Sequence, residues 1–128
     1  MKLPLLALAL TALAAPMLTA TAAPAGNPVS GAKQFLYCKA CHTANQGGAN
    51  TVGPNLWGVA GAKAATRPGF VYSAALRASG IVWTPDQLDA FIARPSGKVP
   101  GTRMAFAGMR NPVARRDLIA YLATLRKK

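Results

Sequence analysis

Both cysteines and the only histidine of this 128-residue chain lie within five consecutive residues, Cys38-Lys39-Ala40-Cys41-His42. The pattern Cys-x-x-Cys-His is typical of c-type haem attachment. Two thiols three positions apart on a helical turn can reach the two vinyl groups on one edge of a porphyrin, and the adjacent histidine then lies below the iron as proximal ligand. The motif therefore predicts a chain folded around one haem, bound covalently through Cys38 and Cys41, with His42 on the iron.

Three other interpretations of the motif compete with haem. A redox disulfide of thioredoxin type belongs at a strand-to-helix turn, and the sequence has no strand-like alternation. A structural zinc ion needs four Cys or His ligands, so a chain with two Cys and one His could bind it only with a second chain. The third interpretation is ordinary buried side chains. Both cysteines and the only histidine lie in one motif, and this favours haem over the disulfide, the zinc site and the ordinary buried side chains.

The first 22 residues have the pattern of an export signal. Lys2 supplies a positive start, residues 3–15 form an apolar stretch, and Ala20-Thr21-Ala22 matches the small-x-small cleavage pattern. A membrane span needs about 20 apolar residues, which disfavours an uncleaved anchor. We expect cleavage after Ala22, a periplasmic location, no membrane span in the mature protein, and one compact domain over residues 23–128.

The chain is strongly basic because Asp86, Asp89 and Asp117 are its only acidic residues. Its net charge is +12, and loss of Lys2 with the signal leaves 12 − 1 = +11. Such a charge favours acidic partners and a salt-dependent association. The Lys and Arg residues are scattered and no nucleic-acid-binding module is visible, so we expect no nucleic-acid partner.

The start of the mature chain predicts a loose arm followed by a helix. Residues 23–29 are rich in Ala, Pro and Gly, which indicates the arm. Over residues 31–39, apolar residues recur at i, i+3 and i+4, which predicts a helix running into the cysteines. The residues on this expected face are Ala32, Phe35 and Leu36.

Two further helices are predicted by their capping residues. Ser73 can cap a short helix through Ala78 that ends at Gly80. A longer helix starts at Thr84-Pro85-Asp86-Gln87, which has the spacing of a capping box, and ends near Arg94 because a proline follows. Its apolar face consists of Leu88, Phe91 and Ile92.

A last helix and the long loops complete the predicted fold. Asn111-Pro112 opens this helix. Residues 43–67 have no sustained period, and so long a loop in a small domain normally wraps around something other than its own core. We predict an all-α fold of three to five helices and long loops around one haem. The apolar residues of the last helix are Leu118, Tyr121, Leu122 and Leu125.

The sixth iron ligand is open from the residues alone. Met17 leaves with the signal, so Met104 and Met109 remain, and either could be a flexible core residue. Met104 is favoured because it lies in the non-helical segment 100–104, where the backbone can direct a thioether at a metal.

Five segments of the chain are similar to class I cytochrome c, particularly the mitochondrial and bacterial c2/c550-type proteins. The likeness extends from Gly31 to Leu125 with the segments in the right order. They are residues 38–42, Gly53-Pro54-Asn55-Leu56, Pro68-Gly69-Phe70-Val71-Tyr72, Gly80-Ile81-Val82-Trp83 and residues 100–108, which begin Pro100-Gly101-Thr102-Arg103-Met104.

The resemblance implies roles for individual residues. Met104 would be the second iron ligand and Met109 a core residue. The Pro54 carbonyl would accept the ring proton of His42 and so fix its tautomer. The resemblance also places Leu56 on the haem face, Gly31 and Phe35 against the last helix near Leu118 and Tyr121, and three hydrogen-bonding residues at the haem propionates: Tyr72, Trp83 and Thr102.

The chain also departs from the family pattern. Ala62 stands where members often have an arginine near the inner propionate, Phe91 where they have a tyrosine near the methionine ligand, and Leu76 where they have a polar residue. We therefore do not expect the family's internal hydrogen-bond network. The lysine ring around the haem edge is thinned as well, with Ser96 and Gly97 at two of its positions and Arg103 and Arg110 remaining.

An iron with His and Met ligands has no open coordination site, so the resemblance implies a soluble, monomeric single-electron carrier and not an enzyme. The expected partners are acidic redox proteins such as a membrane oxidase, a cytochrome bc1-type complex or a periplasmic dehydrogenase. One alternative is a dedicated cytochrome subunit of a periplasmic dehydrogenase. Another is a gas-binding or peroxidatic cytochrome, which would require the methionine to leave the iron.

Overall fold

The computed structural model describes residues 15–17 and 25–127, so nearly all of the predicted export signal lies outside the described residues. The chain is helical, and its one strand-like feature within the described ranges is an isolated bridge between Lys63 and Val82. The predicted all-α fold is therefore confirmed. The elements are α1 (Pro28–Gln34), the 3-10 turn η1 (Phe35–Tyr37), α2 (Ala74–Ala78), α3 (Pro85–Ala93), α4 (Pro95–Lys98) and α5 (Pro112–Thr124).

Helix α1 begins earlier than the sequence predicted. The side chain of Asn27 caps it by accepting hydrogen bonds from the backbone N–H groups of Val29 and Ser30, at 2.9 and 3.2 Å. Pro28 occupies the first turn, where its missing N–H costs nothing. The expectation of a loose arm as far as residue 29 is therefore wrong at its C-terminal end. The helix also ends sooner, at Gln34, and the chain reaches the cysteines through η1.

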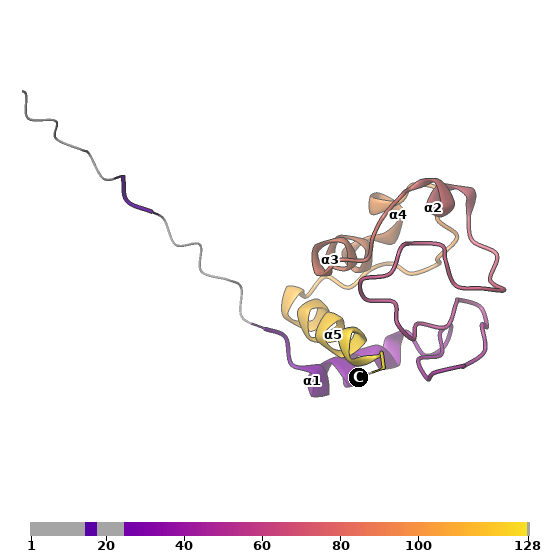
Figure 1. Ribbon diagram of the computed structural model, residues 1–128, viewed down its shortest axis with the longest axis horizontal. Helices are drawn as coiled ribbons and strands as arrows, with labels where there is room; N and C mark the ends of the chain where they lie inside the picture. The colour runs from indigo at the N-terminus through magenta and orange to yellow at the C-terminus, as the bar shows by residue number, and fades with distance from the viewer. Residues whose placement is uncertain (1–14, 18–24, 128) are drawn as a thin grey trace, which may run out of the picture.

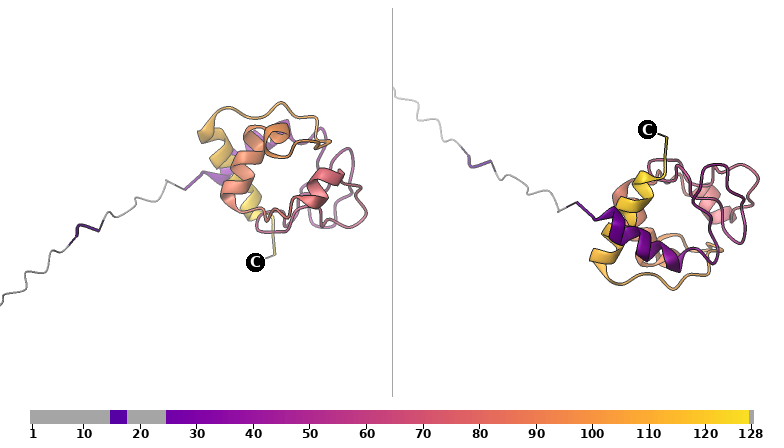
Figure 2. Two further views of the ribbon diagram at one scale, coloured as in Figure 1. Left: turned by 90° about the horizontal axis from the view of Figure 1, so that it is seen from above. Right: turned by 90° about the horizontal axis from the view of Figure 1, so that it is seen from below.

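Helices α1 and α5 pack side by side, as all three ribbon views show (Figures 1 and 2). Gly31 makes this possible, because a Cβ there would overlap the carbonyl oxygen of Asp117 and lie 2.7 Å from Cβ of Tyr121. The rings of Phe35 and Tyr121 meet with centroids 5.3 Å apart. The buried residues here are Gly31 and Phe35, as the family resemblance implied. The periodic face was right for Phe35 but wrong for Ala32 and Leu36, which are exposed.

Helix α3 matches its prediction closely. Thr84 is its N-cap and accepts the backbone N–H of Gln87 at 3.3 Å. Only half of the expected capping box forms, because the backbone N–H of Thr84 donates to the Val82 carbonyl at 2.7 Å instead of to the Gln87 side chain. The predicted apolar face is buried in full: Leu88, Phe91 and Ile92.

Helix α4 was not predicted. It begins at Pro95, directly after α3 ends, because proline fits the first turn of a new helix although it cannot continue the old one. In Figure 1, α2 and α4 lie at the top of the molecule and the α1–α5 pair at the bottom, with long loops between them. No helix in the described part of the chain is long and apolar enough to cross a membrane.

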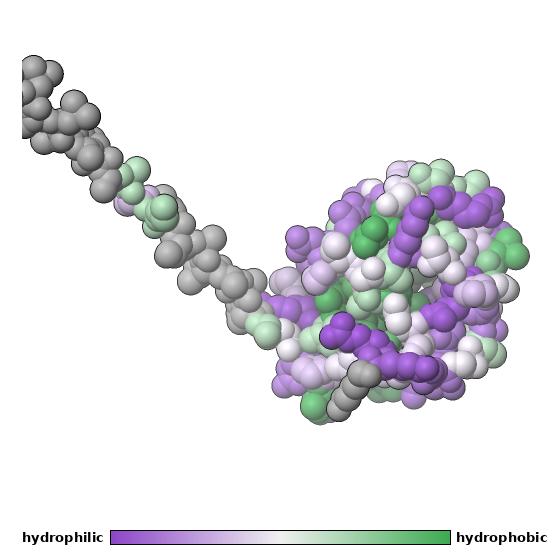
Figure 3. Space-filling view, in the orientation of Figure 1, coloured by the Kyte–Doolittle hydropathy of each residue, from purple (hydrophilic) through white to green (hydrophobic). Residues whose placement is uncertain are grey.

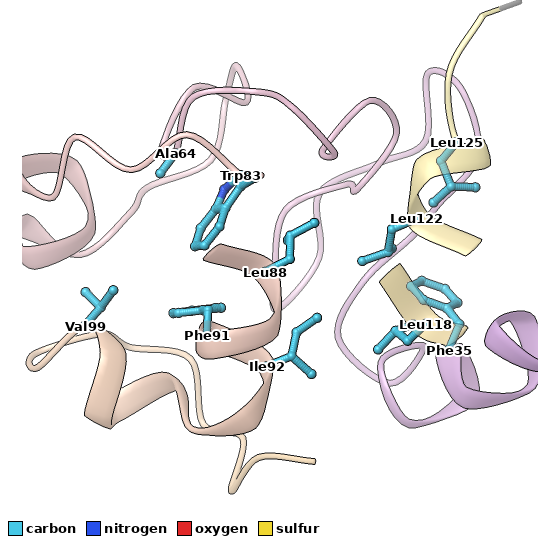
Figure 4. Close-up of a cluster of buried hydrophobic side chains, with 10 residues drawn as sticks. All are labelled: Phe35, Ala64, Trp83, Leu88, Phe91, Ile92, Val99, Leu118, Leu122 and Leu125. Carbon is cyan, nitrogen blue, oxygen red and sulfur yellow. The ribbon is translucent and has the colours of Figure 1, made fainter. Parts of the chain in front are cut away.

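The hydrophobic core lies between these two ends. Side chains from α3 face side chains from α5 and the start of η1 across the interior (Figure 4). Leu118 is the most enclosed, with 1 % of its surface exposed. The buried members are Phe35, Ala64, Trp83, Leu88, Phe91, Ile92, Val99, Leu118, Leu122 and Leu125.

Candidate haem-binding site

A cavity of about 1100 Å³ opens within this core. Ligand pockets usually measure about 300–1,000 Å³, so this one is large for so small a domain. In the space-filling view, hydrophobic residues gather in a hollow at the middle of the face, with hydrophilic residues around it (Figure 3). Seven core residues line the cavity: Phe35, Trp83, Leu88, Phe91, Ile92, Leu118 and Leu122.

Both cysteines line this cavity from one helical turn. The backbone N–H groups of Cys41 and His42 both donate to the Cys38 carbonyl, at 3.0 and 2.9 Å, so the three side chains have fixed relative positions. Both cysteines are free thiols. Burial, followed by the nearby Cys41, raises the pKa of Cys38, so its protonated form is favoured.

The ring of His42 is held by the segment that follows the motif. Its Nδ1 lies 2.7 Å from the Pro54 carbonyl oxygen. Gly53 passes close to the ring face, and a Cβ there would lie 2.7 Å from Nδ1 and 2.8 Å from Nε2. Donation from Nδ1 leaves the Nε2 lone pair free for a metal. Burial lowers the pKa of His42, opposed by the Pro54 hydrogen bond, so the neutral ring is favoured.

The loop after the motif is organised by Asn55, to which the sequence analysis gave no role of its own. Asn55 is only 3 % exposed. Its Nδ2 donates to Oγ1 of Thr43 at 2.8 Å and to the Asn45 carbonyl at 2.9 Å, and its backbone N–H donates to Oδ1 of Asn50 at 2.9 Å. These bonds tie the two ends of the loop together. They fix Pro54, and through it His42.

The two candidate methionines occupy different places. Met104 lines the cavity, and its backbone N–H donates to Oγ1 of Thr102 at 3.3 Å. Met109 does not line it. Its backbone N–H donates to the Ile92 carbonyl at 2.9 Å, and its side chain packs on the core.

The remaining predicted site residues also line the cavity. Trp83 is 7 % exposed, and its ring packs on Phe91 with centroids 5.0 Å apart. The hydroxyl oxygen of Tyr72 accepts the backbone N–H of Arg67 at 3.1 Å. Burial raises the pKa of Tyr72, and the Arg67 hydrogen bond and charge oppose that shift. The structure thus brings all nine predicted cofactor residues to one cavity: Cys38, Cys41, His42, Pro54, Leu56, Tyr72, Trp83, Thr102 and Met104.

The chemistry of this lining fits haem. The cavity offers two thiols on one turn, an imidazole with a free ring nitrogen, a thioether and an apolar wall. A c-type haem with His and Met ligands is held by two thioether-forming cysteines and by nitrogen and sulfur axial ligands in an apolar pocket. The site therefore suits the cofactor that the motif predicts.

Comparisons with known proteins support the same cofactor. No family model matches the chain. It is 45 % identical over 106 residues to cytochrome c2 of Rhodomicrobium vannielii, covering 83 % of this chain and 85 % of that protein. It is 49 % identical to cytochrome c2 of Rhodopila globiformis, covering 81 % and 98 %. The chain belongs to the class I cytochrome c family.

The fold of this cytochrome agrees with that of a solved relative. Cytochrome cH from Methylobacterium extorquens superposes with a TM-score of 0.74 at 45 % identity, covering 77 % of this chain and 99 % of that one. Membership in the family implies covalently bound haem c. Proteins of this family are electron carriers rather than enzymes.

The three departures from the family pattern all lie on the cavity wall of this cytochrome: Ala62, Leu76 and Phe91. None has a polar side chain.

The sequence analysis missed one cation on the same wall, Arg67. Its Nε donates to the Asn55 carbonyl at 3.1 Å, and its Nη2 donates to the Trp57 carbonyl. Its position in a loop without a period offered no signal for this role.

Proposed function

We propose that this cytochrome is an exported monohaem carrier of single electrons between periplasmic or membrane redox partners. Cys38 and Cys41 hold the haem through thioether bonds, and His42 and Met104 ligate the iron. The observation that carries the proposal is that Met104, distant in sequence from the attachment motif, lines the same cavity as the motif, whereas Met109 does not. When bound, haem supplies a one-electron iron couple.

The protein's own residues determine what this site can do. Pro54 accepts the Nδ1 proton of His42, which orients the ring and increases the basicity of Nε2. With Met104 as the second ligand, no position remains for a substrate, so the site transfers electrons and performs no bond chemistry. Leu56 and Trp83 help to exclude water, which favours the less charged reduced state.

The proposed export and covalent attachment are tested by intact mass. After periplasmic expression, we expect a mass equal to residues 23–128 plus one haem, because cleavage follows Ala22 and both thiols react. The haem should stay with the denatured polypeptide in organic solvent. The double variant Cys38→Ala, Cys41→Ala should release it. Release of haem from the wild-type protein would refute the thioether assignment.

The charge of the mature domain supports a transient encounter with acidic partners. Two of its three acids are engaged within the fold: Asp89 pairs with Arg115 at 2.7 Å, and Oδ1 of Asp117 accepts the backbone N–H of Asn27 at 2.8 Å. Arg103 is exposed and lines the cavity, and Arg110 is exposed nearby in sequence. Both residues would therefore help to steer an acidic partner toward the haem edge.

Replacing Arg103 and Arg110 with Glu should slow association with an acidic redox partner by about tenfold at low salt. The effect should vanish at high salt, because exposed charges are screened beyond about 8–10 Å at physiological ionic strength. Stopped-flow electron transfer across a salt series measures it. The double variant Arg126→Glu, Lys127→Glu makes the same charge change away from the cavity lining and should have a smaller effect. A loss that is equal at every salt concentration would contradict steering.

A further inference from the structure

One cation on the cavity wall has no carboxylate partner from the protein. The basic side chains that line the cavity are Lys63, Arg67 and Arg103, and only Arg67 is half-buried. None of the three aspartates of the chain lines this cavity. Removing a charge from water is costly unless an opposite charge offsets it, so a ligand with a carboxylate would be favoured beside Arg67.

The guanidinium of Arg67 is held in place before any ligand arrives. Its Nε donates to the Asn55 carbonyl at 3.1 Å, and its Nη2 donates to the Trp57 carbonyl. Asn55 is itself fixed by hydrogen bonds to the loop that it closes. A guanidinium has five N–H donors, and these two bonds leave three of them for a ligand. Such a fork suits a carboxylate.

Tyr72 adds a second donor beside this fork. Its hydroxyl oxygen accepts the backbone N–H of Arg67 at 3.1 Å, so its own proton remains available. Tyr72 also lines the cavity. The Tyr72 phenol, in contact with the Arg67 backbone, and the Arg67 guanidinium thus both offer donors from the same cavity lining.

We infer that Arg67, with Tyr72, binds a carboxylate side chain of the haem and compensates its charge. This inference rests on the proposed function. Arg67 thereby takes the place of the arginine that family members often have where this chain has Ala62, whose methyl side chain has no hydrogen-bond donor. A fixed positive charge beside the haem carboxylate keeps that group ionised and offsets its negative field at the iron.

The variant Arg67→Gln tests the inference through the reduction potential measured against pH. Without the guanidinium, the pKa of the haem carboxyl rises into the working range, and it is lower in the ferric than in the ferrous protein because ferric haem carries one more positive charge. The potential should therefore fall as pH rises between these two pKa values, with a slope of at most about 59 mV per tenfold change in proton activity for one electron. In the wild type, the carboxyl stays ionised and adds no such slope. The other charged or titratable side chains that line the cavity are Tyr37, Cys38, Cys41, His42, Lys63, Tyr72 and Arg103, and the two cysteines no longer titrate once they are thioethers.

Two matched variants control the experiment. Arg77→Gln removes an exposed arginine whose Nη1 donates to the Tyr72 carbonyl at 2.6 Å but which does not line the cavity, so it should keep the wild-type profile. Arg67→Lys retains the positive charge, so its reduction potential should depend on pH almost as in the wild type. If the Arg67→Gln and Arg77→Gln profiles coincide, the inference is wrong. Covalent haem retention, measured on the same samples, reports separately on the proposed function.

Discussion

Met104→Ala is expected to change the spectrum, the reduction potential and the ligand binding of this cytochrome together. Loss of the thioether should remove the weak red charge-transfer band of the oxidised protein, a feature that the family resemblance implies. The potential should fall, because a thioether favours ferrous iron and axial ligands account for a range of about 0.8 V among haem proteins. The freed site should bind carbon monoxide in the reduced state. Optical spectra and a redox titration measure all three effects.

Met109→Ala is the matched control, because both methionines pack on the core but only Met104 lines the cavity. We expect the band and the potential to persist in this variant. Its cost should be confined to packing, near the lower end of about 2–5 kcal/mol since Met109 is only partly buried. If Met109→Ala is instead the variant that loses the band, the ligand assignment is wrong.

Gly31→Ala is expected to cause a large loss of stability with no direct change at the haem. On an exposed helix surface the same substitution would stabilise by about 1 kcal/mol. Here the new Cβ would overlap the Asp117 carbonyl oxygen and meet Cβ of Tyr121, so α1 and α5 must move apart. Overpacking of this kind costs about 1–3 kcal/mol, and a backbone obstacle places it at the upper end. Urea unfolding of the haem-loaded protein measures it.

Gly97→Ala provides the comparison for that measurement. It places the same methyl group inside a helix, α4, where the nearest atoms belong to the flexible side chain of Arg94. That side chain can move, so the free energy of unfolding should change by less than about 1 kcal/mol. Equal effects of the two substitutions would show that the α1–α5 contact tolerates a wider spacing than the structure indicates.

Helices with strong caps and an apolar period were predictable from sequence. Helix α3 follows its Thr84 cap and its apolar repeat, and α5 follows Asn111 and its leucines. The buried face of α1 was not predictable from periodicity, because its central residue is Gly31, which carries no hydrophobic signal; only the family resemblance placed Gly31 and Phe35 against the last helix. What buries this position is the close approach of a helix distant in sequence. The helical spacing of apolar residues therefore placed Ala32 and Leu36 on the buried face, but both are exposed in the structure.

The site was predictable to the extent that its chemistry is local. Cys38, Cys41 and His42 form a self-contained motif, so spacing alone indicated haem. The choice between two methionines depended on loop context, and it gained a physical basis only when the cavity placed Met104 on its wall. Arg67 was missed because its role depends on the carbonyls of Asn55 and Trp57, and no short sequence pattern encodes that arrangement.

The α1–α5 pairing also has a consequence for how the protein folds. The hydrogen bond from Asn27 to Asp117 joins residues 90 positions apart, and Phe35 of η1 packs against the same helix. Closing a flexible loop of that length costs on the order of 4 kcal/mol of chain entropy, and this cost must be met before the contact can stabilise the fold. Contacts of such high order slow folding. Phe35, Leu118 and Leu122 all line the cavity, so the wall of the haem pocket is complete only once the two helices have docked.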